Sequence, residues 1–315
     1  MDNDSFSSHL SRESETLLEQ KFEDDEGVFI NFRNMSPSEE EEHVINLLIE
    51  ETEFVFKKDE SLVFGDEVEY ARLEAINWIV KTGAAFGFQK KTAYLSMIYF
   101  DRYLWMRPIE TNRQIWLIGL LSVAALRVAA KMEEPKIPSV SKFRYEYNNV
   151  VESKVIGRME LLLLNTFDWK LPSVTPFAFL HYFVTRLCQE SPPRNLLSRI
   201  SALIMATLNE INIVEYRPSI IAAGATLVAL NHKMTKSEVE LKMNSIPHHK
   251  SLNIEDVFSC YNLIQELKID EKTSILSSPI ASSFTNELHN ERERPRSDEH
   301  HDERVNITMP SNSKE

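Results

Sequence analysis

The longest apolar segment of the chain runs over Ile115–Lys131 and reads IWLIGLLSVAALRVAAK. Before the final lysine it is interrupted only by Gly119, Ser122 and Arg127. It is too long for a strand, so we predict a helix that is apolar on nearly every side, which is typical of a core helix or a membrane span. A span needs roughly 20 apolar residues, and this run is shorter and contains a charge. We therefore expect a core helix that other helices surround.

The segments around this helix have the periodicity of amphipathic helices. We predict two helices before it and two after it, the first of these two being short, over residues 66–83, 94–107, 139–147 and 151–163. The same order then repeats over residues 175–189, 195–214, the apolar segment PSIIAAGATLVAL that Pro218 opens, 236–244 and 253–270. The sequence therefore predicts an all-α chain built from a tandem duplication of a five-helix unit.

These patterns divide the chain into four parts. Residues 1–35 are acidic and polar, and we expect them to be disordered. Residues 36–171 would hold an N-terminal helix and the first five-helix unit, and residues 172–270 the second unit. Residues 271–315 become polar again and are predicted to form a disordered tail.

The predicted N-terminal helix has a clear start signal. Ser36-Pro37-Ser38-Glu39 has the spacing of a capping box, with proline at the first helical position. Apolar residues then follow at helical spacing from Val44. We expect an amphipathic helix that packs on the surface of the core.

Composition and charge narrow the function. Seven glycines in 315 residues argue against a glycine-loop nucleotide site, and a net charge of −13 disfavours binding to nucleic acid, because phosphate neutralisation needs a basic surface. The two cysteines, Cys188 and Cys260, cannot form a multi-cysteine zinc site and suit a reducing compartment. The N-terminus has no apolar signal-peptide segment. We expect an intracellular, soluble protein with no metal, cofactor or membrane partner.

Two charged residues fall on inner helix faces. Arg72 lies among apolar positions of the first core helix, and Asp101 does so in the second. Charged side chains are rarely buried unless they are paired. We therefore predict a structural ion pair between Arg72 and Asp101, with a side chain that reaches solvent at the rim as the alternative.

Two further charges allow two interpretations. Lys131 closes the enclosed helix, where a cation meets the negative end of the helix dipole. Glu160 lies within RMELLLL, between Ile156 and Leu164. From spacing alone, both residues fit a solvated position as well as a functional one.

Four motifs occur in an order and spacing that resemble the cyclin box. They read ARLEAINWIV, YFDRYL, AALRVAAKMEEPKIP and MELLLLNTFDWKLPSVTPF, and their sequences are most similar to those of plant D-type cyclins. The resemblance covers roughly residues 39–270. It implies two tandem five-helix cyclin folds and a cyclin-dependent kinase as partner, for which the chain would be a non-catalytic activator.

The resemblance also assigns residues. Arg72 and Asp101 match the buried pair of the family, while Lys131 and Glu160 match the lysine and glutamate that hold the regulatory helix of the kinase. No catalytic residue is implied. Kinase-inhibitor proteins are a further class of partner.

The sequence departs from the family pattern at the substrate-docking groove. Groove-bearing cyclins carry Met-Arg-x-Ile-Leu before the groove tryptophan, which is Trp78 here. This chain has Ala71-Arg72-Leu73-Glu74-Ala75 instead. Ala71, Glu74, Ala75 and Trp78 are the candidate groove residues, and Glu74 and Ala75 replace apolar groove side chains.

A second departure concerns retinoblastoma-type proteins. Most D-type cyclins bind them through Leu-x-Cys-x-Glu near the N-terminus, whereas the first cysteine here is Cys188 and the nearest stretch, residues 17–21, has none. The sequence does not support that route. Among the Ser-Pro pairs, Ser278-Pro279 in the predicted tail is the best candidate phosphorylation site.

We therefore expect a nuclear protein, also found in the cytoplasm, that activates a cyclin-dependent kinase at the G1/S transition. The alternatives are a cyclin-fold transcription factor and a transcription-kinase cyclin. The first needs basic faces and usually a zinc ribbon, which a pI near 5.3 and two helical cysteines oppose. A transcription-kinase cyclin would share the fold, and only the D-type sequence of the motifs distinguishes it from the main expectation.

Overall fold

The computed structural model describes residues 36–53, 66–107, 111–143, 152–188, 193, 195–231, 233–248 and 251–275. Residues 1–272 form one compact unit, and all the contacts below lie within it. Of the second unit, residues 273–315, only the last residues of a helix are described. The predicted tail therefore begins as helix up to Ile275, and Ser278 lies outside the described residues, as do residues 1–35.

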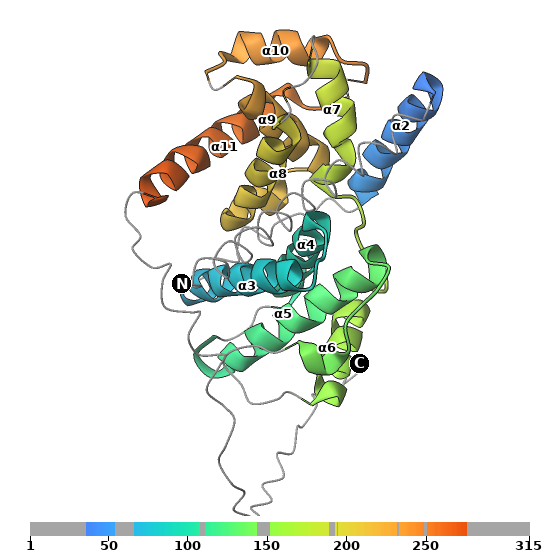
Figure 1. The fold of residues 1–315 in the computed structure, drawn as a ribbon, viewed down its shortest axis with the longest axis vertical. Helices are drawn as coiled ribbons and strands as arrows, with labels where there is room; N and C mark the ends of the chain where they lie inside the picture. Colours follow the sequence, from blue (N-terminus) through green and yellow to red (C-terminus); the bar gives the residue numbers. More distant parts are fainter. Residues whose placement is uncertain are drawn as a thin grey trace, which may run out of the picture. The chain divides into compact units, whose positions relative to one another are not determined.

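The first repeat surrounds its apolar helix as predicted. It consists of α3 (Asp66–Ala85), α4 (Lys90–Met106), α5 (Thr111–Glu133), the 3-10 helix η1 (Val140–Lys142) and α6 (Ser153–Thr166). α5 packs against α3, α4 and α6 (Figure 1). Every residue from Ile118 to Ala130 is buried, and after this buried run α5 reaches the surface at Lys131.

The second repeat is built in the same way around α9. Its elements are η2 (Pro176–Phe179), α7 (Leu180–Leu187), α8 (Leu196–Ala206), η3 (Thr207–Asn209), η4 (Ile211–Glu215), α9 (Pro218–Leu230), α10 (Lys236–Asn244) and α11 (Ile254–Ile275). α9 packs against α7 and α8 and is buried over 219–229. A Cβ at Gly224 would lie 3.3 Å from Cys260 Sγ and from the Tyr261 backbone nitrogen. The glycine thus lets α11 approach α9 closely.

Three predicted helices differ from those observed. The helix expected over 175–189 begins as the 3-10 helix η2 and continues as α7, which ends at Leu187. The short helix expected near 139–147 is the 3-10 helix η1 in the part that is described. The helix expected over 195–214 ends at Ala206 and continues as η3 and η4. The carbonyl oxygen of Leu208 accepts a hydrogen bond from Arg72 Nη1 at 2.7 Å, and Thr207 Oγ1 donates to the Ile204 carbonyl oxygen. These competing bonds are consistent with the end of the α-helical ladder here.

Arg72 connects the two repeats. Its Nε and Nη2 each lie 2.8 Å from a different carboxylate oxygen of Asp101, which joins α3 to α4. Its Nη1 reaches the carbonyl oxygen of Leu208 in the second repeat. Arg72 is 2% exposed and Asp101 3%. A planar guanidinium satisfies both acceptors at once, which a lysine ammonium could not do with the same geometry.

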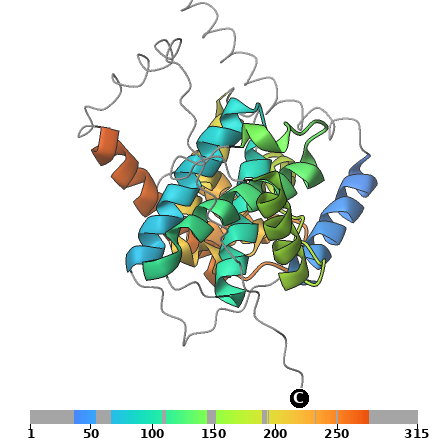
Figure 2. The ribbon, with the colours of Figure 1, turned by 90° about the horizontal axis from the view of Figure 1, so that it is seen from below.

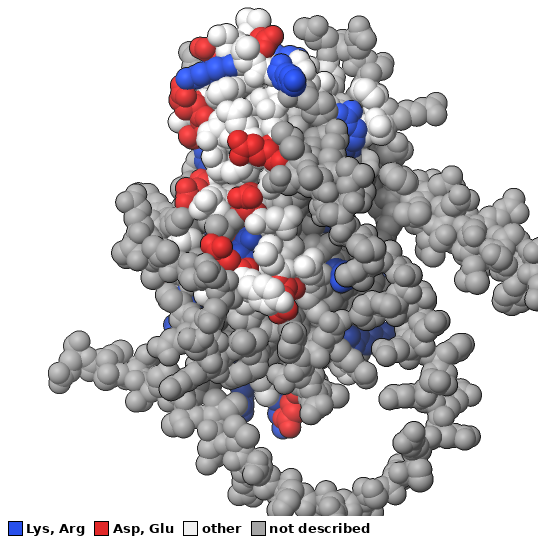
Figure 3. All heavy atoms as spheres, turned by 90° about the vertical axis from the view of Figure 1, so that its left-hand side faces the viewer, with Lys and Arg blue, Asp and Glu red and all other residues white. Residues whose placement is uncertain are grey.

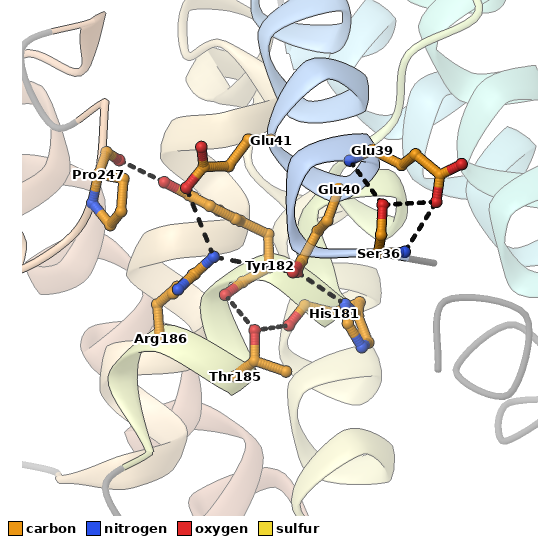
Figure 4. Close-up of polar contacts among 9 residues, drawn as sticks. All are labelled: Ser36, Glu39, Glu40, Glu41, His181, Tyr182, Thr185, Arg186 and Pro247. Carbon is orange, nitrogen blue, oxygen red and sulfur yellow. Dashed lines mark hydrogen bonds and ion pairs between the residues drawn. The ribbon is translucent and has the colours of Figure 1, made fainter. Parts of the chain in front are cut away.

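Helix α2 (Pro37–Glu53) makes its polar contacts with the second repeat, although the sequence order groups it with the first. Glu40 Oε1 lies 3.1 Å from His181 Nδ1, and Arg186 Nη2 lies 3.7 Å from Glu40 Oε2 (Figure 4). Figure 2 shows α2 at the periphery of the helices. The predicted capping box is present: Glu39 N donates to Ser36 Oγ and Ser36 N to Glu39 Oε2.

The other end of α2 caps α9. Both the Ser219 backbone N–H and the Ser219 hydroxyl donate to the carboxylate of Glu51, at 2.9 and 2.6 Å. Arg217 Nη1 lies 3.6 Å from the same carboxylate. The residue before α9 makes no side-chain cap of its own, so a glutamate from a distant helix supplies the acceptor that the first turn needs. Burial raises the pKa of Glu51 despite these three partners.

No helix in the described part of the chain has the length and hydropathy that crossing a bilayer requires. The burial of residues 118–130 against α3, α4 and α6 confirms the expectation that the apolar helix is a core helix. α5 ends in Lys131 and Glu133 and is enclosed by its neighbours in the first repeat.

Replacing Arg72 by alanine is expected to lower the free energy of unfolding by about 3–5 kcal/mol, because Asp101 would remain buried without its cation. The melting temperature should fall by roughly 2–4 °C for each kcal/mol in a domain of this size, which scanning calorimetry would resolve. The double variant Arg72→Leu/Asp101→Leu is the control, and it should be more stable than Arg72→Ala. An unchanged melting temperature for Arg72→Ala would contradict the structural role of the pair.

At pH 7, Glu51→Gln is expected to raise the free energy of unfolding and Glu51→Ala to lower it. The alanine variant leaves the Ser219 donors without an acceptor and should lose about 1–3 kcal/mol, whereas glutamine keeps an acceptor and removes a charge that burial disfavours. The pKa of Glu51 is higher in the folded protein than its ordinary value of 4.5. The Glu51 carboxyl therefore stabilises the fold most below pH 4.5, and this stabilisation is lost as the pH rises through the folded-state pKa. The increase in the free energy of unfolding caused by Glu51→Gln should therefore be present at pH 7 and vanish near pH 4.5.

Denaturant unfolding of both variants at the two pH values tests this explanation. If Glu51→Gln is as destabilised as Glu51→Ala at pH 7, the negative charge itself holds α2 on α9, and the capping explanation is wrong.

Candidate functional site

The structure brings Lys131 and Glu160 together at the end of α5. Lys131 lies in the last turn of α5, and Glu160 lies in α6, which packs against it. The Lys131 Nζ to Glu160 Oε2 distance is 2.6 Å. The two residues therefore form one ion pair and do not act as separate surface charges.

Arg127, which in the sequence is only an interruption of the apolar run, is a third member of this cluster. Its Nε lies 2.5 Å from Glu160 Oε1, so that Glu160 contacts a cation with each of its oxygens. Arg127 and Lys131 are four residues apart, which places both on one face of α5. The sequence did contain a signal for this role of Arg127. It is a charged residue one turn before Lys131, in a helix that is otherwise predicted to be apolar on every side.

The guanidinium of Arg127 is held from a second side as well. It lies over the ring of Phe143, with its Cζ 5.0 Å from the ring centroid. Phe143 follows η1 and is 4% exposed. Arg127 Nη1 is buried and has no hydrogen-bond partner among the described residues. Stacking and the bond to Glu160 thus fix the group without satisfying all of its donors.

The three side chains differ in their access to solvent. The side chain of Lys131 is 45% exposed, whereas those of Arg127 and Glu160 are 8% and 10% exposed. The solvated alternative for Glu160 is therefore wrong, because its carboxylate lies beneath the lysine. Lys131 presents the ammonium at the surface.

Large apolar side chains are exposed next to these residues in sequence. Met132 is 53% exposed, Leu161 51% and Leu162 38%. Exposed apolar groups near a fixed charge are typical of a protein interface. The arrangement can bind a partner through apolar contact and one oriented cation.

The residues after Lys131 fix the end of α5 to the start of α4. Glu133 Oε2 lies 2.6 Å from Lys91 Nζ. Glu134 Oε1 accepts hydrogen bonds from the Gln89 backbone N–H at 2.8 Å and from the Thr92 hydroxyl. Gln89 makes no side-chain cap on α4, so Glu134 supplies it. These contacts limit the motion of the backbone that carries Lys131.

The candidate groove residues lie on α3 at different depths. Ala71 is 6% exposed and Ala75 is fully buried. Glu74 and Trp78, one turn apart, are partly exposed, and Trp78 packs against the core. The groove assignment stays a prediction, and Glu74 and Trp78 are its accessible members.

The two cysteines are free thiols, Cys260 buried and Cys188 partly buried. Burial raises the pKa of Cys260 to about 12, so its thiol stays protonated. Within the described ranges, no cluster of three or more His, Cys, Asp and Glu side chains could hold a metal. His249, His300 and His301 lie outside them.

Comparison with known proteins agrees with the two-repeat architecture. The cyclin N-terminal domain model matches residues 43–172, and the cyclin C-terminal domain model matches residues 174–285. The boundary between the matches falls between the two repeats, at the end of the segment that follows α6.

Curated relatives narrow the family further. The chain is 34% identical over 290 residues to Cyclin-D5-1 of Arabidopsis thaliana, which covers 88% of this chain and 87% of the relative. It is 38% identical to Cyclin-D5-1 of Oryza sativa subsp. japonica and 37% identical to Cyclin-D1-1 of Arabidopsis thaliana, over 61% and 64% of this chain and 53% and 60% of those relatives. The chain therefore belongs to the cyclin family, and within it to the plant D-type cyclins.

Proposed function

We propose that this chain binds and activates a cyclin-dependent serine/threonine kinase and so promotes the G1/S transition. Its membership in the cyclins gives it a regulatory role in the cell cycle. What we propose beyond this regulatory role is the kinase partner and the action at the G1/S transition. The chain itself would be non-catalytic and would need no cofactor.

The observation that carries the proposal is the exposed ammonium of Lys131 on a fixed support. Its Nζ is tied to Glu160 at 2.6 Å, and the backbone at the end of α5 is held by Glu134. Met132 and Leu161 expose apolar surface beside these two charged residues in sequence. A rigid surface of this kind suits recognition of a helix from another protein, because little side-chain freedom is lost on binding.

Activation would follow from selective binding. An active kinase needs a Lys–Glu ion pair between a strand and its regulatory helix. A partner that binds only the conformation in which this pair is assembled shifts the population towards the active kinase. The difference in affinity between the two conformations sets the size of the activation.

Further parts of the proposal concern partners and location. Kinase-inhibitor proteins would bind the complex, and the protein would act in the nucleus and also occur in the cytoplasm. Binding of retinoblastoma-type proteins through Leu-x-Cys-x-Glu is not part of the proposal, because no cysteine precedes Cys188. Phosphorylation at Ser278 is proposed from its Ser-Pro sequence alone.

Direct DNA binding is disfavoured by charge. The chain carries 48 acidic and 35 basic side chains. On the face seen in Figure 3, acidic groups are scattered over uncharged surface, and lysines and arginines form separate spots. A duplex requires several cations in register to release its counterions. A transcription-factor role of that type has no support in this pattern.

Lys131→Ala is expected to weaken binding to a plant cyclin-dependent kinase by about 10-fold or more, because truncating a hot-spot residue costs about 2 kcal/mol or more and each ~1.4 kcal/mol is a factor of ten in affinity. Titration calorimetry with purified kinase and a phosphate-transfer assay would measure the loss. Lys236→Ala is the matched control, because Lys236 is also half-exposed and paired with a glutamate, Glu255, on α11. Equal binding by wild type and Lys131→Ala would contradict the proposed interface.

A further inference from the structure

A cavity lies at the junction of the two repeats, with a volume of about 90 Å³. We propose that this junction cavity binds one leucine-sized apolar side chain of a partner peptide, and that Arg217 donates a hydrogen bond to a main-chain carbonyl oxygen of the same peptide. Neither Lys131 nor Glu160 lines the cavity. The inference is therefore independent of the proposed function.

The walls of the junction cavity come from separate parts of the fold. They are α2, α4, the segment that joins the two repeats, and the stretch from η3 to the first turn of α9. Ligand sites are common at such junctions between folded units. A group bound here would contact both repeats and α2 at once.

The floor of the junction cavity is apolar. Tyr94, Leu208 and Ile221 line it and are at most 3% exposed. Ile98 and Val214 also line it, but they are only partly buried. An apolar group that entered beside these two residues would therefore leave water for a surface that is apolar as well.

The volume of the junction cavity limits what can enter. An engineered apolar cavity of about 150 Å³ binds benzene, and sites for drug-sized molecules span roughly 300–1,000 Å³. A cavity of about 90 Å³ therefore admits one branched aliphatic chain of the size of a leucine side chain. Such a small group binds weakly alone, because each non-hydrogen atom contributes a limited free energy. A peptide that continues over the rim adds contacts, which favours a peptide over a free small molecule.

The charges around the junction cavity favour an uncharged occupant. Asp101 holds Arg72 with both carboxylate oxygens, and Glu51 accepts two hydrogen bonds from Ser219. The lining has three acidic and two basic side chains, and Arg72 behind Asp101 brings the formal charge to zero. An ion that entered would lose its hydration without a net opposite charge to replace it.

Arg217 supplies the polar contact. Its Nη2 donates to the Ser251 carbonyl oxygen at 2.9 Å, and its Nη1 lies 3.6 Å from Glu51 Oε1, while the side chain is 23% exposed. A guanidinium has five N–H donors, so donors remain for an acceptor at the rim. A main-chain carbonyl oxygen is the uncharged acceptor that every peptide residue carries. Because these contacts already order Arg217, little side-chain freedom would be lost on binding.

Methyl NMR on the full chain tests the site with an uncharged probe peptide, acetyl-Ser-Leu-Ser-amide. We expect the peptide to shift the signals of Ile98, Ile213 and Ile221, which line the cavity, and to saturate with a dissociation constant in the millimolar range. Acetyl-Ser-Ala-Ser-amide should bind about 10-fold or more weakly, because it buries fewer apolar groups. Acetyl-Ser-Glu-Ser-amide, which brings a charge, should not bind.

Variants of the walls test the same site. Ile98→Trp fills the cavity from a partly exposed position and should abolish binding, and Val214→Trp replaces it if the first variant does not fold by circular dichroism. Arg217→Met should weaken binding of the leucine peptide about 3- to 10-fold, through loss of one hydrogen bond. Arg199→Met is the matched control and should bind normally. Arg199 also donates to a main-chain carbonyl oxygen, that of Ala229 at 2.8 Å, but does not line the cavity.

Three results would overturn the inference. The first is equal binding of the leucine and alanine peptides, or binding that the tryptophan variants leave unchanged. The second is wild-type affinity of Arg217→Met, which would refute the hydrogen bond to the peptide. The third is equally tight binding of methyl isobutyl ketone, which has a leucine-sized chain and a carbonyl group, because the cavity would then be a small-molecule site. No kinase takes part in these measurements, so their failure would leave the proposed function standing.

Discussion

A helix that is apolar on every side must be enclosed, and this constraint organises the protein. α5 and α9 are buried along nearly their whole described length, and the other helices of each repeat cover them. Small side chains and the glycine at 224 let those helices approach closely. Residues 118–130 of α5 are all buried, and Lys131 is the first residue after them that is exposed. The same burial that stabilises the repeat therefore places Lys131, the residue for which we propose partner binding, at the exposed end of α5.

Buried and partly buried charges connect the helices that pack around α5 and α9. Arg72 joins α3, α4 and the carbonyl oxygen of Leu208, and Glu51 and Glu134 accept from the first turns of α9 and α4. Each contact satisfies a backbone or side-chain group that its own segment leaves unpaired. They act as directional links between surfaces that apolar packing alone would not orient.

The cluster of Arg127, Glu160 and Lys131 also joins two helices through paired charges, but one of its members is exposed. Arg127 and Glu160 are buried and paired, as the links elsewhere are, but the third member remains accessible. A group that is fixed by its neighbours and still has donors to offer is suited to recognition, because its ordering has taken place during folding. The contacts that pair the buried members of this cluster are therefore the same contacts that orient its exposed member.

The sequence by itself determined the helical class, the two repeats, the capping box at Ser36 and the two charges that would need each other, Arg72 and Asp101. These are properties of local periodicity, end signals and the cost of burying a single charge. Only the tertiary structure decided that Glu160 lies beneath Lys131, that Arg127 holds it, that Glu51 caps α9 and that α8 gives way to 3-10 turns at Thr207. Each of these depends on which distant residue lies within hydrogen-bond reach, and spacing along one chain does not contain that distance.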